Sequence, residues 1–210
     1  MNTITLQTIL TKNAEHLQNF QTNALMHCIQ STKMQDSIYR ERLLDGIQVL
    51  SNYFQKIIML RSVLTENTRF LKIAQIHLTE EFGHNISLMK DRHQKPPIWD
   101  AVLEGCCAWF AWKMFTLDDV DRTLLVHLVL ESSANLFFHQ AHQIMTRYGE
   151  TNYFKLHSDV DEHHEALGIT LLKGLNELHY LHLLDIQQQG WDMLNTICRR
   201  IAELALNDNH

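Results

Sequence analysis

The sequence predicts an all-α protein, and three features of its composition carry that prediction. Its 210 residues include only 2 prolines and 7 glycines. A β-sandwich or β-barrel needs turn residues about every eight to twelve positions, so this composition argues strongly against an all-β fold. Hydrophobic residues make up 45% of the chain, which at this length is enough for one large core. We therefore expect a single helical domain over residues 1–210.

Apolar residues recur at helical spacing through seven segments of the chain. We expect helices at 6–25, 38–60, 71–89, 99–115, 120–148, 152–178 and 183–206. Ser31 and Thr32 interrupt the pattern after the first, Pro96 and Pro97 separate the third from the fourth, and Gly149 ends the fifth. Helices of about 15 to 30 residues joined by short loops are typical of a bundle.

Smaller signals refine three of these boundaries. Thr65 to Thr68 is typical of a capping region before the third helix, and Thr116 to Asp119 of an N-cap before the fifth. Gln187 to Gly190 indicates an irregularity within the seventh helix.

The charge balance limits the classes of partner. The chain has 24 acidic and 18 basic residues, a formal charge of −6, and no cluster of Lys and Arg, which argues against nucleic acid. The first twenty residues lack the pattern of a signal peptide, and no apolar stretch reaches the length of about 18 residues that a membrane-spanning helix needs. We expect a cytoplasmic protein that acts on a small molecule and has no membrane partner.

Four cysteines are present, and none of their spacings is that of a zinc or redox motif. Cys106 and Cys107 lie in an apolar run, which is typical of buried core thiols. A nucleophilic role for one of this pair remains the alternative.

The chain is rich in histidine, with 14 residues, and two segments place histidines at helical spacing from a carboxylate. Both have the spacing His-x3-Asp/Glu-x2-His. At about 100° per residue, offsets of four and seven bring three side chains within about 60° on one helix face. The two sets are His77, Glu81 and His84, and His157, Asp161 and His164.

Two further helices offer carboxylates. Glu131 is the one carboxylate between Thr123 and Tyr148, and it ends an apolar stretch. A buried glutamate is costly unless it is paired, protonated or bound to metal. Glu41 and Asp45, one turn apart in the second helix, are candidates for a fourth contribution.

Together these residues suggest a carboxylate-bridged di-metal site. In helical bundles of this type, two helices each supply a carboxylate-x-x-His pair and other helices supply a bridging Glu. Glu81 with His84 and Asp161 with His164 would be the pairs, and Glu131 the bridge. Such ligands suit ferrous or manganous ions and leave open positions for O2. Taken alone, the segment that contains His77 is equally compatible with a solvated helix face.

The segment 152–168 resembles the YFxxHxxxDxxH element of the haem-oxygenase-like di-metal oxidases. The order of a Glu/His helix, a lone-Glu helix and a His-Asp-His helix is also similar. The resemblance implies a seven-helix haem-oxygenase-like bundle with two irons, or iron with manganese. It further implies O2 activation for the oxidation, C–C cleavage or hydroxylation of a small molecule.

The resemblance also implies a ligand set. The first metal would be held by Glu81, His84 and Glu131, and the second by His157, Asp161 and His164, with Glu131 bridging. Some members carry a Glu seven residues before the first His, where this chain has His77, so His77 is a further candidate.

Two alternatives of other classes remain. The same superfamily includes thiaminase-II-like hydrolases, which use a Cys nucleophile, and the cofactor-free oxidase of pyrroloquinoline quinone synthesis. A non-catalytic interaction protein with a vestigial metal site is the other alternative.

Bundles of this type often form homodimers. We expect the second, fourth and seventh helices to line an apolar substrate pocket.

Overall fold

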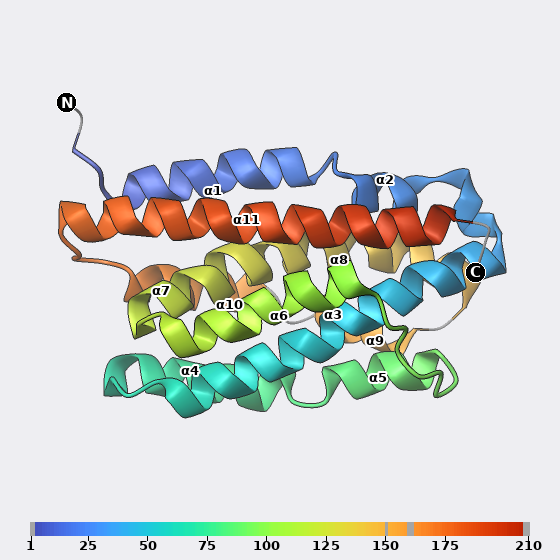
Figure 1. Ribbon diagram of the computed structural model, residues 1–210, viewed down its shortest axis with the longest axis horizontal. Coiled ribbons are helices and arrows are strands. Elements are labelled where there is room, and N and C mark those ends of the chain that lie inside the picture. Colours follow the sequence, from blue (N-terminus) through green and yellow to red (C-terminus); the bar gives the residue numbers. More distant parts are fainter. Residues whose placement is uncertain (1–2, 150, 159–161, 208–210) are drawn as a thin grey trace.

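The computed structural model describes residues 3–149, 151–158 and 162–207 (Figure 1). Within these ranges every regular element is a helix, which confirms the predicted fold class. Most of the helices run along the longest dimension of the molecule. None of those described is long and apolar enough to cross a membrane.

The first two predicted helices are present with altered boundaries. The segment predicted as one helix at 6–25 forms α1 (Leu6–Phe20) and α2 (Ala24–Gln30), and the Asn23 side chain caps α2. A short 3-10 turn, η1 (Thr32–Gln35), leads into α3 (Ser37–Leu64), the second predicted helix.

The prediction of one continuous helix over 71–89 is wrong. Two helices occupy this region, α4 (Thr68–Glu81) and α5 (His84–Asp91). Gly83 between them has a φ of +90°, in the left-handed region that glycine enters at little cost. The next helix, α6 (Ala101–Thr116), begins after Asp100, whose carboxylate caps it.

The fifth predicted helix is one helical run with a change of winding. It comprises α7 (Asp119–Leu124), the π-helical segment η2 (Leu125–Glu131), α8 (Ser132–Met145) and the 3-10 turn η3 (Thr146–Tyr148). The Asp118 side chain accepts hydrogen bonds from the backbone at Val120 and Asp121, which confirms the predicted N-cap region.

The last two predicted helices also differ from the structure in their bounds. The described elements here are α9 (Asn152–Ser158) and α10 (Glu162–Leu171), and the prediction of a helix as far as residue 178 is wrong, because α10 ends at Leu171. The final helix, α11 (Glu177–Leu206), begins earlier than predicted and passes through Gln187 to Gly190 without a break. Gly190 lies where α11 packs closely against η2, and a Cβ at this position would lie 2.6 Å from the end of the Leu125 side chain.

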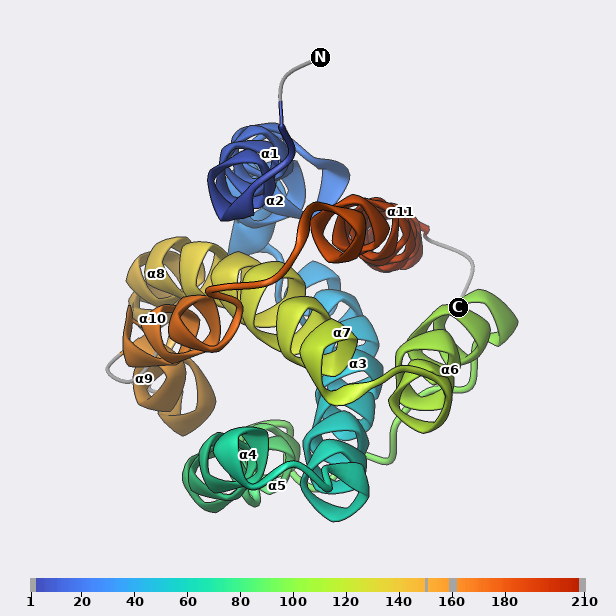
Figure 2. The same ribbon diagram turned by 90° about the vertical axis from the view of Figure 1, so that its left-hand side faces the viewer.

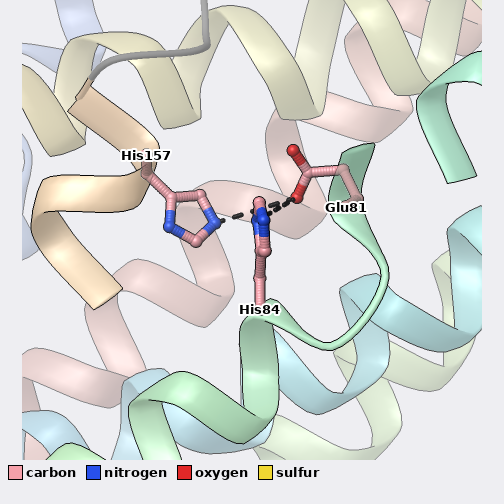
Figure 3. Close-up of side chains that lie close together, drawn as sticks. All are labelled: Glu81, His84 and His157. Atoms are coloured by element: carbon pink, nitrogen blue, oxygen red, sulfur yellow. Dashed lines mark ion pairs between the residues drawn. The ribbon is translucent and has the colours of Figure 1, made fainter. Parts of the chain in front are cut away.

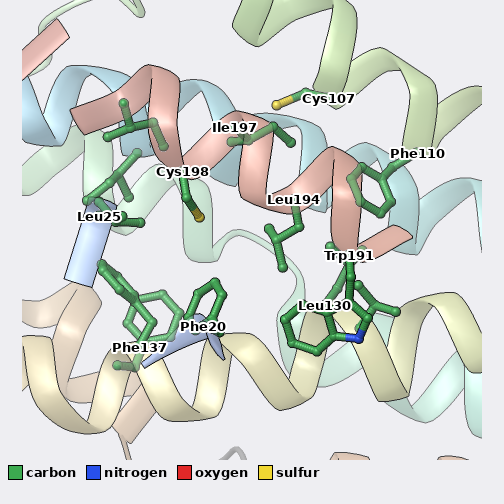
Figure 4. Packing of buried hydrophobic residues seen from close by; sticks show 14 of the residues in the cluster. Phe20, Leu25, Cys107, Phe110, Leu130, Phe137, Trp191, Leu194, Ile197 and Cys198 are labelled. Carbon is green, nitrogen blue, oxygen red and sulfur yellow. The ribbon is translucent and has the colours of Figure 1, made fainter. Parts of the chain in front are cut away.

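Viewed end-on, α7 lies near the centre of the bundle, with α4, α6, α10 and α11 around it (Figure 2). α4 and α5 lie on one side of the molecule, and α1 and α11 on the opposite side. α11 packs against α1, α3, α6 and η2, while α10 covers η2 from another side. Four buried residues of α11 pack among buried side chains of other helices (Figure 4). They are Trp191, Leu194, Ile197 and Cys198. The segment η2 is therefore held between α10 and α11.

Candidate metal centre

Two histidines and one glutamate come together from three helices (Figure 3). The Nδ1 atom of His84 lies 3.0 Å from Oε2 of Glu81, and Nε2 of His157 lies 3.8 Å from the same oxygen. One possible ligand atom from each of the three residues lies within 4.8 Å of the others. Glu81 and His157 are buried, and the side chain of His84 is 13% exposed. A single cation between them would contact all three.

The break between α4 and α5 brings Glu81 and His84 to this point. Glu81 is the last residue of α4, His84 is the first of α5, and Gly83 makes the turn between them. No other side chain of the described structure lies near the Cβ position at Gly83, so its positive φ, not crowding, is the reason for a glycine.

The imidazole of His157 is fixed by its surroundings. Its Nδ1 lies 2.8 Å from the carbonyl oxygen of Tyr153, so Nδ1 carries the proton and Nε2 faces Glu81 with its lone pair. The ring stacks on Phe138 at 4.2 Å. Burial lowers the pKa of His157 below its usual 6.5, and the charge of Glu81 only partly offsets this. A neutral imidazole held in this way is the form that binds metal.

Glu131 lies beside this group and meets His77. Its Oε1 is 2.7 Å from Nε2 of His77, and both side chains are 2% exposed. On the other edge of the ring, Nδ1 of His77 lies 3.3 Å from Nη1 of Arg61. Arg61 is buried, and that burial lowers its pKa to about 10 although the charge of Glu131 opposes the shift. The imidazole of His127 stacks on His77 at 5.3 Å.

The π-helical segment η2 sets the direction of Glu131, its last residue. A π turn adds a residue to the helix and rotates the side chains that follow it, and such turns are frequent at functional sites. The hydroxyl of Ser132 donates to the carbonyl of His127 at 3.1 Å and accepts from Asn13 at 3.4 Å. These bonds supply partners for polar groups inside the bundle at the end of the π turn.

His127 also depends on a close helix contact. A Cβ at Gly168 of α10 would lie 2.3 Å from Cβ of His127, closer than real Cβ contacts allow. Only glycine at this position lets α10 approach η2 so closely.

An apolar cavity of about 80 Å³ opens next to these groups. That volume is several times what one water needs. Glu81, Glu131 and His157 stand in its wall among mainly apolar and aromatic side chains from α1, α2, α3, α8, α9 and α11. The second and seventh predicted helices therefore line a pocket as expected. The expectation for the fourth is wrong, because α6 contributes none of the described lining residues.

The structure separates the predicted site residues into three sets. Glu81, His84 and His157 meet, with Glu131 and His77 beside them. Glu41 pairs with Lys95 and Asp45 with Arg92, and neither lines the cavity. Asp161, and the side chain of His164, fall outside what the structure describes.

Sequence reasoning missed Arg61 and the helix irregularities. A basic residue within the apolar run that ends α3 was the available signal for Arg61. Gly83 between Glu81 and His84 was the signal for the break. The π turn before Glu131 has no recognisable sequence signal.

The sequence left open a nucleophilic role for Cys106 or Cys107, and the structure places both outside the described cavity wall. Cys107 is buried, Cys106 is partly buried, and burial raises the pKa of both. Neither is among the described residues that line the cavity, whereas Cys198 is. Burial raises the pKa of Cys198 to about 12, so its thiol is protonated at neutral pH.

Solved structures define the class of fold. A domain of unknown function with a heme oxygenase-like fold from Shewanella denitrificans superimposes with a TM-score of 0.70 and 15% identity, covering 94% of this chain and 92% of that one. A TenA homolog from Pseudomonas syringae pv. tomato gives a TM-score of 0.63 and 15% identity, covering 91% and 93%. The chain therefore has the haem-oxygenase-like fold, as its resemblance implied.

Sequence comparison gives the narrower relationship. No family model matches the chain. The uncharacterized protein RP592 of Rickettsia prowazekii (strain Madrid E) is 35% identical over 205 residues, which are 98% of this chain and 97% of that protein. This chain belongs to the same protein family as RP592.

Proposed function

We propose that this protein is a metal-dependent enzyme that uses O2 to oxidise a small apolar molecule. The observation that supports the proposal most is the buried group of Glu81, His84 and His157 in or beside the wall of an apolar cavity. Two imidazoles and one carboxylate with open positions are the ligand set of many non-haem iron oxygenases. The haem-oxygenase-like fold is compatible with this chemistry but does not by itself identify it.

The residues fit a divalent iron or manganese ion. A buried carboxylate with two imidazoles mixes hard oxygen and borderline nitrogen ligands, which suits these ions. Burying such groups is costly unless they are paired or coordinate a metal. His157 presents a lone pair toward Glu81, and the carbonyl of Tyr153 holds its other nitrogen. The predicted two-metal centre, with Glu131 as bridge and Asp161 and His164 as further ligands, is part of the proposal.

The chain's own residues would do three things. Glu81, His84 and His157 hold the ion, which when bound supplies the redox chemistry that O2 requires. Apolar side chains such as Phe54 and Phe137 in the cavity wall exclude water from it. The scarcity of polar groups in that wall favours an apolar or amphipathic substrate.

Anaerobic loading with ferrous iron tests the proposal. We expect the purified chain to retain at least one equivalent of iron, and admitting air to change the optical absorption of the bound iron. His84→Gln and His157→Gln should each reduce retained iron. His139→Gln is the matched control, because His139 is exposed on α8 and outside the cavity wall. Absence of retained metal in the unmodified chain, or equal metal content in all variants, would contradict the proposal.

A metal-free hydrolase with a thiol nucleophile is the second candidate. The fold is similar to that of a TenA homolog, and one thiol, that of Cys198, lines the cavity. Activity that survives a chelator but is lost in Cys198→Ser would favour this candidate. Cys107→Ser is the control, because Cys107 is a buried thiol outside the described cavity wall.

A further inference from the structure

Three buried polar side chains form a line from α3 through α4 to the end of η2. Arg61 lies on α3, His77 on α4, and Glu131 ends η2. The ring of His77 stands between the other two, 3.3 Å from Nη1 of Arg61 through Nδ1 and 2.7 Å from Oε1 of Glu131 through Nε2. All three side chains are almost fully buried.

The chemistry of Arg61 fixes the direction of this line. A guanidinium has donors only, and it stays protonated at neutral pH. A pKa of about 10 for Arg61 does not change this. Nδ1 of His77 must therefore accept from Arg61, so in the neutral ring the proton is on Nε2, the nitrogen that faces Oε1 of Glu131.

This orientation is the reverse of what a metal-binding histidine needs. A ligating imidazole keeps a lone pair on the nitrogen that faces the metal and donates its other N–H to an acceptor. His157 has that arrangement, because its Nδ1 faces the carbonyl of Tyr153 and its Nε2 faces Glu81. In His77, by contrast, Nδ1 faces a hydrogen-bond donor, the guanidinium of Arg61, instead of an acceptor.

We propose that Arg61 and His77 are positioning residues for Glu131, and that His77 is not a metal ligand. The cation of Arg61 lies behind His77, and Nε2 of His77 lies 2.7 Å from Oε1 of Glu131, so the ring fixes the position of that carboxylate at the cavity wall. The inference concerns the site of the proposed function, but its first test does not require bound metal.

The tautomer of His77 is that first test. In metal-free protein labelled with 15N in its histidines, His77→Gln and His157→Gln identify the two rings by loss of their signals. We expect the ring of His77 to carry its proton on Nε2 and that of His157 on Nδ1. A proton on Nδ1 of His77 would overturn the proposal, whether or not the protein binds metal.

Metal affinity is the second test. The amide of His77→Gln can accept from Arg61 and donate to Glu131, so we expect cobalt(II) affinity to stay within about threefold of the unmodified chain, compared with the 10–100-fold typical for loss of an outer-shell partner. His77→Ala removes the donor and should lower affinity about tenfold. His84→Gln, which removes a proposed ligand, should lower it further.

The outcomes separate the two proposals. An affinity loss in His77→Gln equal to that in His84→Gln would make His77 a ligand and overturn the inference. No cobalt binding by any form, including the unmodified chain, would overturn the proposed function, and the 15N measurement would still decide the role of His77.

Discussion

The long helices of the scaffold and the helices that carry the site differ in regularity. α3 and α11 run for 28 and 30 residues without a break. In contrast, Glu81 and His84 flank the break at Gly83, Glu131 ends a π turn, and His157 lies one residue before the end of α9. The scaffold follows helical periodicity, whereas the directions of the site residues depend on departures from it.

The segment from His77 to His84 shows what such a departure does. On one continuous helix, His77, Glu81 and His84 would share a face. The break after α4 instead leaves His77 against Glu131 and turns His84 toward Glu81 and His157. One predicted ligand triplet thus supplies residues to two adjacent groups of buried histidine and glutamate side chains.

Trp191→Ala should have the largest effect on the scaffold. Trp191 is fully buried on α11, and its Nε1 donates to Oδ1 of Asn13 at 3.0 Å. Removing a buried tryptophan typically costs about 3–5 kcal/mol, so urea unfolding should show a loss of that size. Trp112→Ala is the control, because Trp112 is 62% exposed and should change stability by much less. Equal losses in both variants would contradict the packing described for α11.

Gly168→Ala should disturb the contact between scaffold and site. The new Cβ would meet His127, and overpacking of this kind typically costs about 1–3 kcal/mol. Gly105→Ala is the matched control, because its Cβ position in α6 has no described atom within 4 Å apart from its chain neighbours and the backbone of its own helix. Replacing glycine by alanine within a helix usually stabilises by about 0.5–1 kcal/mol. Opposite signs in thermal unfolding would support the close approach of α10 to η2, and equal signs would argue against it.

The pH dependence of stability should come partly from His157. Its pKa is lowered by burial, so below the ordinary value of 6.5 the unfolded chain binds a proton that the folded chain resists. Stability of the chelator-treated protein should therefore fall as pH decreases through 6.5 toward the lower folded pKa. His157→Gln should reduce this slope in urea unfolding between pH 7 and 5, a range of about two units around the ordinary histidine value. An unchanged slope would show that other groups cause it.

Much of the fold was predictable because helix periodicity is local. The positions of α3, α6 and α11 follow from apolar spacing, and Pro96 and Pro97 mark the longest connection between helices. The break at Gly83 was not predicted, because apolar residues continue at helical spacing beyond it.

Some of the residues that come together were predictable, but their grouping was not. The spacing of His and carboxylate selected Glu81, His84 and His157, and the apolar stretch before it selected Glu131. Two carboxylates one helical turn apart also selected Glu41 and Asp45, because sequence spacing does not show which partner a helix face will meet. Lys95 and Arg92, which pair with them, are some fifty residues away in the sequence. The role of His77 likewise depends on Arg61 of another helix.

Glu41→Gln should have the smallest effect and test the boundary of the site. Glu41 and Lys95 are 56% and 45% exposed, and Lys95 holds the pKa of the Glu41 carboxyl below its ordinary value. An exposed ion pair contributes about 0.2–1 kcal/mol, so the loss of stability should be near the lower end of that range. Iron retained after anaerobic loading should be unchanged, because Glu41 is bound to Lys95 and is not among the lining residues of the cavity. A loss of iron comparable to that in His84→Gln would place Glu41 in the metal centre and extend the site onto the regular surface of α3.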